Sequence, residues 1–216
     1  MLTYGSPSEE ISNQPISAGF FNETNYLNEF ITPHNLGVEQ LYERLDAPTL
    51  KEKIYNCWSW VANNIKYVQS VSGALKIGGK VSRQDDLWSY PNLTISTKLG
   101  NCFSKSTLLT SLLRNALPDD KVSLVLGNIT SDGIGGHAYV ICQLDSEIYL
   151  LESTRPDIKN PFVIASDAQI YQPIVFVSEH ETSFIPERHI KEPLGMCCLE
   201  FLADYLNSRL CTEWRE

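Results

Sequence analysis

The chain has 216 residues, of which 43% are hydrophobic and 20% charged, a composition typical of a folded globular protein rather than a disordered one. This length can bury a substantial core, so we expect a single domain. The net charge of −9 and the absence of any Lys- or Arg-rich run argue against nucleic-acid and anionic-membrane partners. No stretch reaches the roughly 18 apolar residues of a membrane-spanning helix, and residues 1–13 lack a signal-peptide pattern, so we expect a cytoplasmic protein.

The first part of the chain is predicted to contain an N-terminal arm, about residues 1–48, followed by one clear helix. Residues 1 to about 36 show no regular pattern, so we expect irregular structure there. Thr49-Leu50-Lys51-Glu52 matches a capping box. After it, apolar residues recur at helical spacing, namely Ile54, Trp58, Val61 and Ile65. This periodicity predicts a core helix that starts at Thr49.

Residues 69–100 are predicted to form a long loop. The segment is interrupted by small or rigid residues, namely Gly73, Gly78, Gly79 and Pro91. Trp88 lies in its polar and aromatic part, residues 85–90. Because long loops in compact domains are often functional, we expect this loop to contribute to a site.

A second helix is predicted to begin at Cys102, directly after Gly100-Asn101, and to end before Pro118. Cys102, Leu109 and Leu113 fall on one helix face, so we expect the thiol on a face that packs inward. The first N–H groups of a helix have no partner within the helix, and they favour a thiolate beside them.

A strand over residues 122–126 and a Gly-rich connector, residues 131–136, precede a predicted β-hairpin. Its strands are residues 137–144 and 147–152. If Asp145 and Ser146 form the loop, Leu144 pairs with Glu147. His137 and Glu152 then become diagonal neighbours on one face, with Cβ atoms roughly 7 Å apart. A glutamate side chain spans that distance, so Glu152 can reach the imidazole.

The remaining patterns predict a strand over residues 174–177 and a C-terminal helix, about residues 196–214. The six cysteines show no disulfide-framework spacing, so we expect most of them to be reduced and buried. His180 and His189 lie among acidic residues but without a metal-binding spacing. We therefore expect neither a metal nor a cofactor.

Cys102, His137 and Glu152 supply the residue types of a nucleophile, its base and an orienting carboxylate. Taken singly, each has an ordinary explanation: Cys102 as a buried cysteine, His137 as a hydrogen-bonded core histidine and Glu152 as a solvated strand end. Their joint occurrence favours a catalytic set. The indole N–H of Trp88 would be a second donor, beside the Cys102 backbone N–H, for an oxyanion.

The order of four motifs resembles the transglutaminase-like superfamily of papain-like folds. The motifs are the Trp88 loop, Gly100-Asn101-Cys102, His137-Ala138-Tyr139-Val140 and Leu151-Glu152-Ser153-Thr154. The resemblance covers roughly residues 49–156. It implies Cys102 as nucleophile, His137 as base and Glu152 as third member. We therefore expect an α+β fold in which a helical part bearing Cys102 packs on an antiparallel sheet. The family usually has Asp at Glu152 and often an acidic residue at Asn101.

These features predict a cysteine-dependent amide hydrolase or acyltransferase that forms a thioester with a peptide or protein substrate. The glycines before His137 favour access of water, and therefore hydrolysis. The alternatives are a protein-crosslinking transamidase and a catalytically silent peptide-binding module on the same fold. Alkylation of Cys102 near pH 6 favours an enzyme, whereas reaction only above about pH 8 favours the module. The sequence leaves the substrate and the oligomeric state open.

Overall fold

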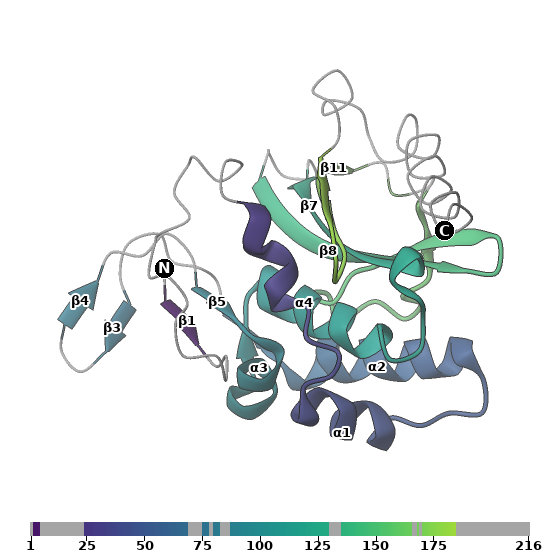
Figure 1. Ribbon diagram of the computed structural model, residues 1–216, viewed down its shortest axis with the longest axis horizontal. Helices are drawn as coiled ribbons and strands as arrows, with labels where there is room; N and C mark the ends of the chain where they lie inside the picture. Colours follow the sequence, from purple (N-terminus) through teal and green to yellow (C-terminus); the bar gives the residue numbers. More distant parts are fainter. Residues whose placement is uncertain are drawn as a thin grey trace, which may run out of the picture.

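The computed structural model describes residues 2–4, 24–68, 75–77, 80–82, 87–129, 135–165, 168 and 170–184. Within these residues the helices form one layer and an antiparallel sheet forms another (Figure 1). Helix α4 (Cys102–Leu113) lies between the sheet and the other helices. The α+β arrangement predicted from the sequence is therefore confirmed.

The helical layer is built from short elements around two longer helices. The α-helices are α1 (Leu36–Arg44), α2 (Leu50–Asn64), α3 (Pro91–Thr97) and α4. The 3₁₀ helices are η1 (Thr24–Phe30) and η2 (Asp119–Lys121). No helix of the described ranges combines the length and apolar character needed to cross a bilayer.

The main sheet of the described residues has six strands in the order β10-β9-β8-β7-β11-β12, and all its neighbouring pairs are antiparallel. Its strands are β7 (Val122–Ile129), β8 (Gly135–Leu144), β9 (Glu147–Leu151), β10 (Val163–Ile164), β11 (Tyr171–Val177) and β12 (Thr182–Phe184). Three short ribbons pair β1 (Leu2–Tyr4) with β5 (Leu87–Ser89), β2 (Lys66–Tyr67) with β6 (Leu99–Gly100), and β3 (Leu75–Ile77) with β4 (Lys80–Ser82).

Helix α2 begins where the sequence predicts. The Glu52 N–H donates to the Thr49 hydroxyl at 3.3 Å, and the Thr49 N–H donates back to the Glu52 carboxylate at 3.2 Å. This reciprocal pair is the capping box, and it supplies partners for N–H groups that the helix itself leaves free. Trp58 and Val61 lie on the buried face.

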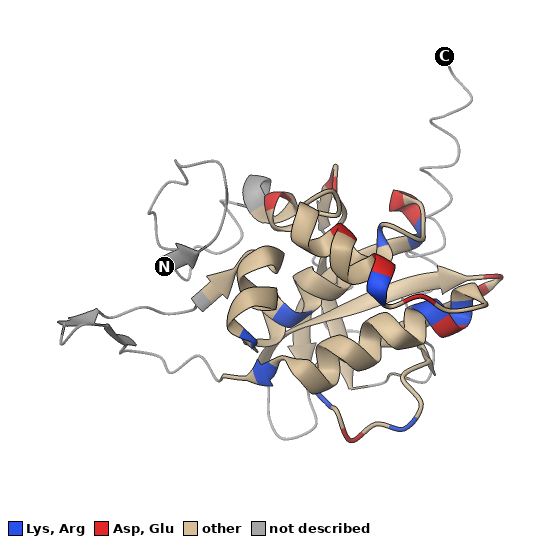
Figure 2. Ribbon diagram, turned by 90° about the horizontal axis from the view of Figure 1, so that it is seen from below, with Lys and Arg blue, Asp and Glu red and all other residues tan. Residues whose placement is uncertain are grey.

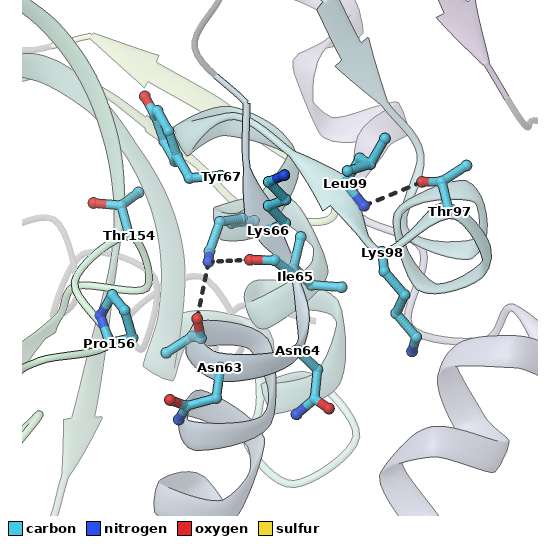
Figure 3. A pocket seen from close by; sticks show the side chains of 12 residues that line it. Asn63, Asn64, Ile65, Lys66, Tyr67, Thr97, Lys98, Leu99, Thr154 and Pro156 are labelled. Carbon is cyan, nitrogen blue, oxygen red and sulfur yellow. Dashed lines mark hydrogen bonds between the residues drawn. The ribbon is translucent and has the colours of Figure 1, made fainter.

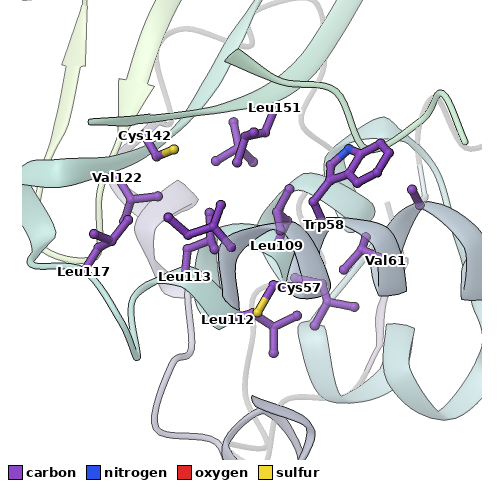
Figure 4. Packing of buried hydrophobic residues seen from close by; sticks show 14 of the residues in the cluster. Cys57, Trp58, Val61, Leu109, Leu112, Leu113, Leu117, Val122, Cys142 and Leu151 are labelled. Atoms are coloured by element: carbon purple, nitrogen blue, oxygen red, sulfur yellow. The ribbon is translucent and has the colours of Figure 1, made fainter. Parts of the chain in front are cut away.

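Helix α4 is buried on all sides, because the sheet covers one face and the other helices cover the rest. Leu109 and Leu113 pack inward as predicted, but the opposite face is buried as well. Figure 4 shows leucines of α4 between Trp58 of α2 and Cys142 of β8. Burial of each leucine contributes about 1.5–3 kcal/mol, so this packing fixes the helix against the sheet.

The β8–β9 hairpin has the predicted register. Leu144 pairs with Glu147, and the ladder continues to Val140 opposite Leu151. Asp145 takes a φ of 56°, a left-handed conformation that Asp tolerates better than most residues. The two-residue loop therefore forms although it lacks glycine.

Gly127 lies at the closest approach of β11 to β7. It pairs with His137 of β8 on one side and with Pro173 of β11 on the other. A Cβ atom at this position would lie 2.1 Å from the backbone oxygen of Gln172. Only glycine therefore permits β11 to approach β7 as it does.

Two sequence predictions need correction. The segment 69–100 is not a continuous loop, because its described part contains α3 and the strands β3, β4, β5 and β6. Pro91 occupies the start of α3, but the helix has seven residues rich in Thr, Ser and Ile, which are poor helix formers, so no helical pattern is visible. The region before residue 36 contains η1, which is too short to show a period. The C-terminal helix and most of the first 23 residues lie outside the described residues.

Candidate active site

Cys102 is the first residue of α4. The preceding Asn101 is the N-cap, and its side-chain oxygen accepts the Ser104 N–H at 2.9 Å. The thiol is partly exposed, whereas Asn101 is buried. The backbone N–H of Cys102 is among those that a helix leaves unpaired, and the positive end of the helix dipole favours negative charge on the sulfur. Asn101, which stands where the resembled family often has an acidic residue, therefore has a structural role as the N-cap of α4.

His137 connects the other two predicted residues. Its Nε2 lies 2.6 Å from Oε2 of Glu152, and its ring also hydrogen bonds with the Cys102 side chain. An ionised carboxylate only accepts hydrogen bonds, so Nε2 carries the proton. Nδ1 is then the ring nitrogen left for the hydrogen bond with the thiol. The structure thus brings together Cys102, His137 and Glu152, which are separated by 35 and 15 positions along the sequence.

The Glu152 carboxylate is 3% exposed and receives hydrogen bonds from four groups. Besides His137, the Tyr171 hydroxyl donates to Oε2 at 3.0 Å. Thr154 donates to Oε1 through its N–H at 2.8 Å and its hydroxyl at 2.6 Å. The indole of Trp58 donates to the Glu152 backbone carbonyl at 2.8 Å. These contacts hold the carboxylate in one orientation toward the imidazole.

The pKa of His137 is raised and the pKa of Glu152 is lowered, so both residues favour their charged forms. Burial lowers the pKa of His137, but its hydrogen bonds and electrostatic interactions with Cys102 and Glu152 outweigh that effect and raise the pKa to about 10. Burial raises the pKa of Glu152, but the contacts with His137 and Thr154 outweigh it, so the net shift is downward. At neutral pH the site therefore contains an imidazolium between an ionised Glu152 and the sulfur.

Two hydrogen bonds connect helix α4 to its surroundings. The Ser106 hydroxyl, one turn after Cys102, donates to the backbone oxygen of Ala138 at 3.0 Å. Ala138 directly follows His137, so this contact fixes the position of α4 relative to the imidazole. The Ser104 hydroxyl accepts the Ser89 N–H at 3.0 Å and fixes β5 beside the start of α4.

Trp88 lies in a buried aromatic cluster beside Cys102. Its ring stacks on Phe103, with centroids 3.9 Å apart, and meets Phe30 edge to face at 5.8 Å. Cys102 packs against the same cluster. Trp88 is therefore a neighbour of the site through Phe103, while its role as an oxyanion donor stays a prediction.

Several residues of the site were not predicted. Thr154 follows Glu152 by two positions, and its local hydroxyl and N–H contacts are a turn pattern that the sequence does offer. Tyr171 arrives from β11, and Ser106 reads as an ordinary polar helix residue. Neither has a local signal, because both depend on how the layers pack.

The contact between Tyr171 and Glu152 predicts a measurable loss of stability. Tyr171→Phe removes a hydrogen bond to a buried charge, so we expect the free energy of unfolding at pH 7 to fall by about 1–3 kcal/mol. The control is Tyr149→Phe, because Tyr149 lies on the hairpin and packs on Phe162. It should change the free energy of unfolding by less than about 0.5 kcal/mol. Urea denaturation measures both, and equal stability of Tyr171→Phe and the wild type would contradict the assigned contact.

No group of three or more His, Cys, Asp or Glu side chains with metal-binding geometry occurs in the part of the chain that the structure describes. His180 lies in this part, whereas His189 lies outside it.

The described thiols other than Cys102 are Cys57 and Cys142, both buried, and burial raises the pKa of each to about 12. Cys102 thus differs from both in exposure and in having an imidazole partner.

Known proteins share this architecture. The UPF0252 protein MJ1282 of Methanocaldococcus jannaschii is 31% identical over 135 residues, which are 59% of this chain. The chain spans only 38% of the length of that relative. Two solved structures of Legionella pneumophila LapG, one EGTA-treated and one calcium-bound, each match with a TM-score of 0.52 and 14% identity. They cover 85% and 84% of this chain and 97% of LapG, and they show that the fold is shared.

The model of one family, described as the transglutaminase-like domain, matches residues 36–174. This range is more than half of the chain, and it contains Cys102, His137, Glu152 and Tyr171. It agrees with the resemblance that the sequence motifs show on their own. The chain therefore belongs to the family of transglutaminase-like domains.

Proposed function

We propose that the chain is a cysteine-dependent amide hydrolase that acts on peptide or protein substrates through a thioester. The observation that carries the proposal is the position of His137. Its ring is hydrogen-bonded to the Cys102 side chain, and its Nε2 lies 2.6 Å from Oε2 of Glu152. A nucleophile, a base and an orienting group in this order are the template for nucleophilic catalysis. Membership of the family supports the thiol chemistry, and the site geometry supports the assignment of roles.

In the first step the Cys102 thiolate attacks the carbonyl carbon of an amide, and a carbon–sulfur bond forms. The carbonyl oxygen becomes an oxyanion, for which the Cys102 backbone N–H is a donor and Trp88 a proposed second donor. The His137 imidazolium gives its proton to the amide nitrogen as the carbon–nitrogen bond breaks. An amine leaves, and a thioester remains on Cys102.

In the second step a water molecule attacks the thioester. Neutral His137 takes a proton from the water, the carbon–sulfur bond breaks, and the thiolate returns with the carboxylic acid as product. An amine in place of water would give a new amide. Gly136, beside His137 on β8, is exposed, and a Cβ atom there would meet nothing within 4 Å. This open approach favours water as the acceptor.

The proposal predicts hydrolysis of peptide amides without efficient transfer to amines. A diverse peptide library, incubated with the protein in ¹⁸O-labelled water and with a fluorescent primary amine, should give products with one ¹⁸O in the new carboxyl group and little fluorescent label. Protein pretreated with iodoacetamide is the blank.

Two results would contradict this proposal. Dominant incorporation of the amine would make the protein a transamidase. No turnover, together with a Cys102 that iodoacetamide fails to modify near pH 6, would make it a binding module, because an activated thiol reacts at a pH where ordinary thiols do not.

A further inference from the structure

A lysine-lined groove lies next to the catalytic residues but is separate from them. It has a volume of about 530 Å³ and is formed where the C-terminal end of α2 meets the β2–β6 ribbon, α4 and the turn after Glu152 (Figure 3). Its lining includes Lys66, Lys98, Lys105, Thr97 and Thr154. None of the roles assigned above to the catalytic residues uses this space.

The groove is positively charged in an acidic protein. Three lysines line it, and no Asp or Glu does among the described residues around it. The whole chain, by contrast, has 26 acidic and 17 basic residues. Figure 2 shows blue segments grouped at the lower left of the molecule, where no red is drawn. Charge of one sign in a recess attracts a ligand group of the opposite sign.

Lys105 places a cation at the base of the groove. Its side chain is 1% exposed, and its ammonium donates to the backbone oxygens of Ile65 at 2.8 Å and Ala62 at 3.2 Å. An ammonium has three N–H donors, and these two carbonyls accept two of them, so the charge of Lys105 is fixed beside the groove. Burial lowers the pKa of Lys105 to about 8, although the Glu152 carboxylate partly offsets it. An anion in the groove would stabilise the charged form of Lys105.

Lys98 is a second lysine of the lining. It ends α3 with a φ of 58°, in the left-handed region that favours glycine. Its ammonium lies 4.0 Å from the centroid of the Trp60 ring, which holds the charge in one place. A backbone position suited to glycine thus has a positioned cation instead.

The groove is close enough to the thiol to contact the same substrate. Leu99, in its wall, precedes Cys102 by three residues, so their Cα atoms are at most about 11 Å apart. Thr154, in the opposite wall, donates directly to the Glu152 carboxylate. An extended peptide advances about 3.3 Å per residue. A residue two to four positions from the attacked amide therefore lies within reach of the groove.

We infer that this groove binds a carboxylate of the peptide substrate, supplied by an acidic residue two to four positions from the attacked amide or by a nearby chain terminus. The inference rests on the proposed function for the identity of the ligand as a substrate. Lys66, Lys98 and Lys105 supply the positive charge. The enzyme would accordingly favour acidic over neutral peptides.

Binding to the Cys102→Ala variant tests this inference without requiring turnover. The probes are fluorescein-labelled decapeptides that contain one Asp, moved stepwise along a neutral background, each paired with the same peptide containing Asn. Each is made with a free and with an amidated C-terminus, which separates a side-chain carboxylate from a terminal one. Fluorescence anisotropy should show at least one carboxylate peptide binding about 5- to 20-fold more tightly than its neutral partner.

A lysine variant then locates the effect. Lys66→Gln combined with Lys98→Gly, in the same Cys102→Ala background, should reduce the preference to within about twofold, and it should fold because glycine suits the backbone at Lys98. Lys51→Gln is the matched control, since Lys51 is also a lysine over aromatic rings, 5.1 Å from Phe162, but is not part of the groove. It should leave the preference unchanged.

Equal affinity of charged and neutral peptides, absence of binding by both, or a preference that survives the double lysine substitution would overturn the inference. These outcomes are distinct from failure of the proposed function. If wild-type protein hydrolyses peptides without any acidic preference, the function stands and the groove assignment falls. If acidic peptides bind through the lysines but no amide is cleaved, the groove stands and the hydrolase falls.

Discussion

Cys102→Ala is expected to reduce amide hydrolysis by about 10⁴-fold or more while the protein remains folded. The proposed reaction requires a sulfur that forms the thioester, and alanine provides no substitute nucleophile. The cost in stability should be modest, about 1 kcal/mol, because the side chain is small, partly exposed and at a helix start. Steady-state kinetics and thermal unfolding of the same preparation measure the two effects.

Cys57→Ala is the matched control for loss of a thiol. Cys57 is buried in the core formed by α2 and α4, so its removal should lower stability and leave the rate per folded molecule unchanged. Retention of turnover in Cys102→Ala would refute the nucleophile assignment. Loss of turnover in Cys57→Ala at full folding would show that the assay depends on packing rather than on the thiol at the site.

Glu152→Gln is expected to lower kcat/KM by about 10²- to 10⁴-fold. Glutamine has the same shape but no charge, and its amide group presents N–H donors where Glu152 faces the donors His137, Tyr171 and Thr154. The imidazolium then loses both its counter-charge and its fixed orientation. Asp157→Asn, in an exposed carboxylate paired with Arg155, is the control and should keep the wild-type rate.

The pH dependence gives a second test of the same substitution. The pKa of His137 is raised to about 10 in the folded protein, so the wild-type rate should stay high through neutral pH and fall as the pH rises through about 10. In Glu152→Gln this alkaline fall should occur about 1–3 pH units lower, because an opposite charge is gone. An unchanged alkaline limb would show that Glu152 does not govern the base.

The same shift affects stability with a defined sign. The unfolded-state pKa of histidine is about 6.5, below the folded value. The stabilisation from the His137 contacts is therefore complete below about pH 6.5 and declines as the pH rises through about 10. Thermal unfolding across this range should show the decline in wild-type protein and a smaller one in Glu152→Gln.

The contact between His137 and Glu152 could be predicted because it depends on local rules. Side chains alternate along strands, and a two-residue loop fixes which residues oppose each other, so the pairing of Leu144 with Glu147 determines the rest. The loop kept its length without glycine because Asp145 accepts a positive φ. The position of Cys102 at a helix start was visible for the same reason, since Asn101 is a strong N-cap residue.

The parts that escaped prediction depend on packing between distant segments. Tyr171 reaches Glu152 because β11 lies beside β7 in the sheet, an order that no local pattern specifies. Ser106 and Thr107 are polar yet fully buried, because their hydroxyls donate to the backbone oxygens of Ala138 and Phe103. The expectation that polar residues lie on the surface cannot predict a helix buried on every side. The burial of Lys105 was not predicted for the same reason.

The distribution of the site along the chain has a consequence during biosynthesis. Translation proceeds from the N-terminus, and Cys102 is made 35 residues before His137 and 69 before Tyr171. The base and its carboxylate share a local hairpin, which can form within microseconds once it is synthesised. The thiol, by contrast, meets the imidazole only when α4 packs on the finished sheet. Under the proposed function, the nascent chain therefore carries a cysteine without its imidazole partner, and the complete set of Cys102, His137 and Glu152 is assembled only when α4 and the sheet have packed together.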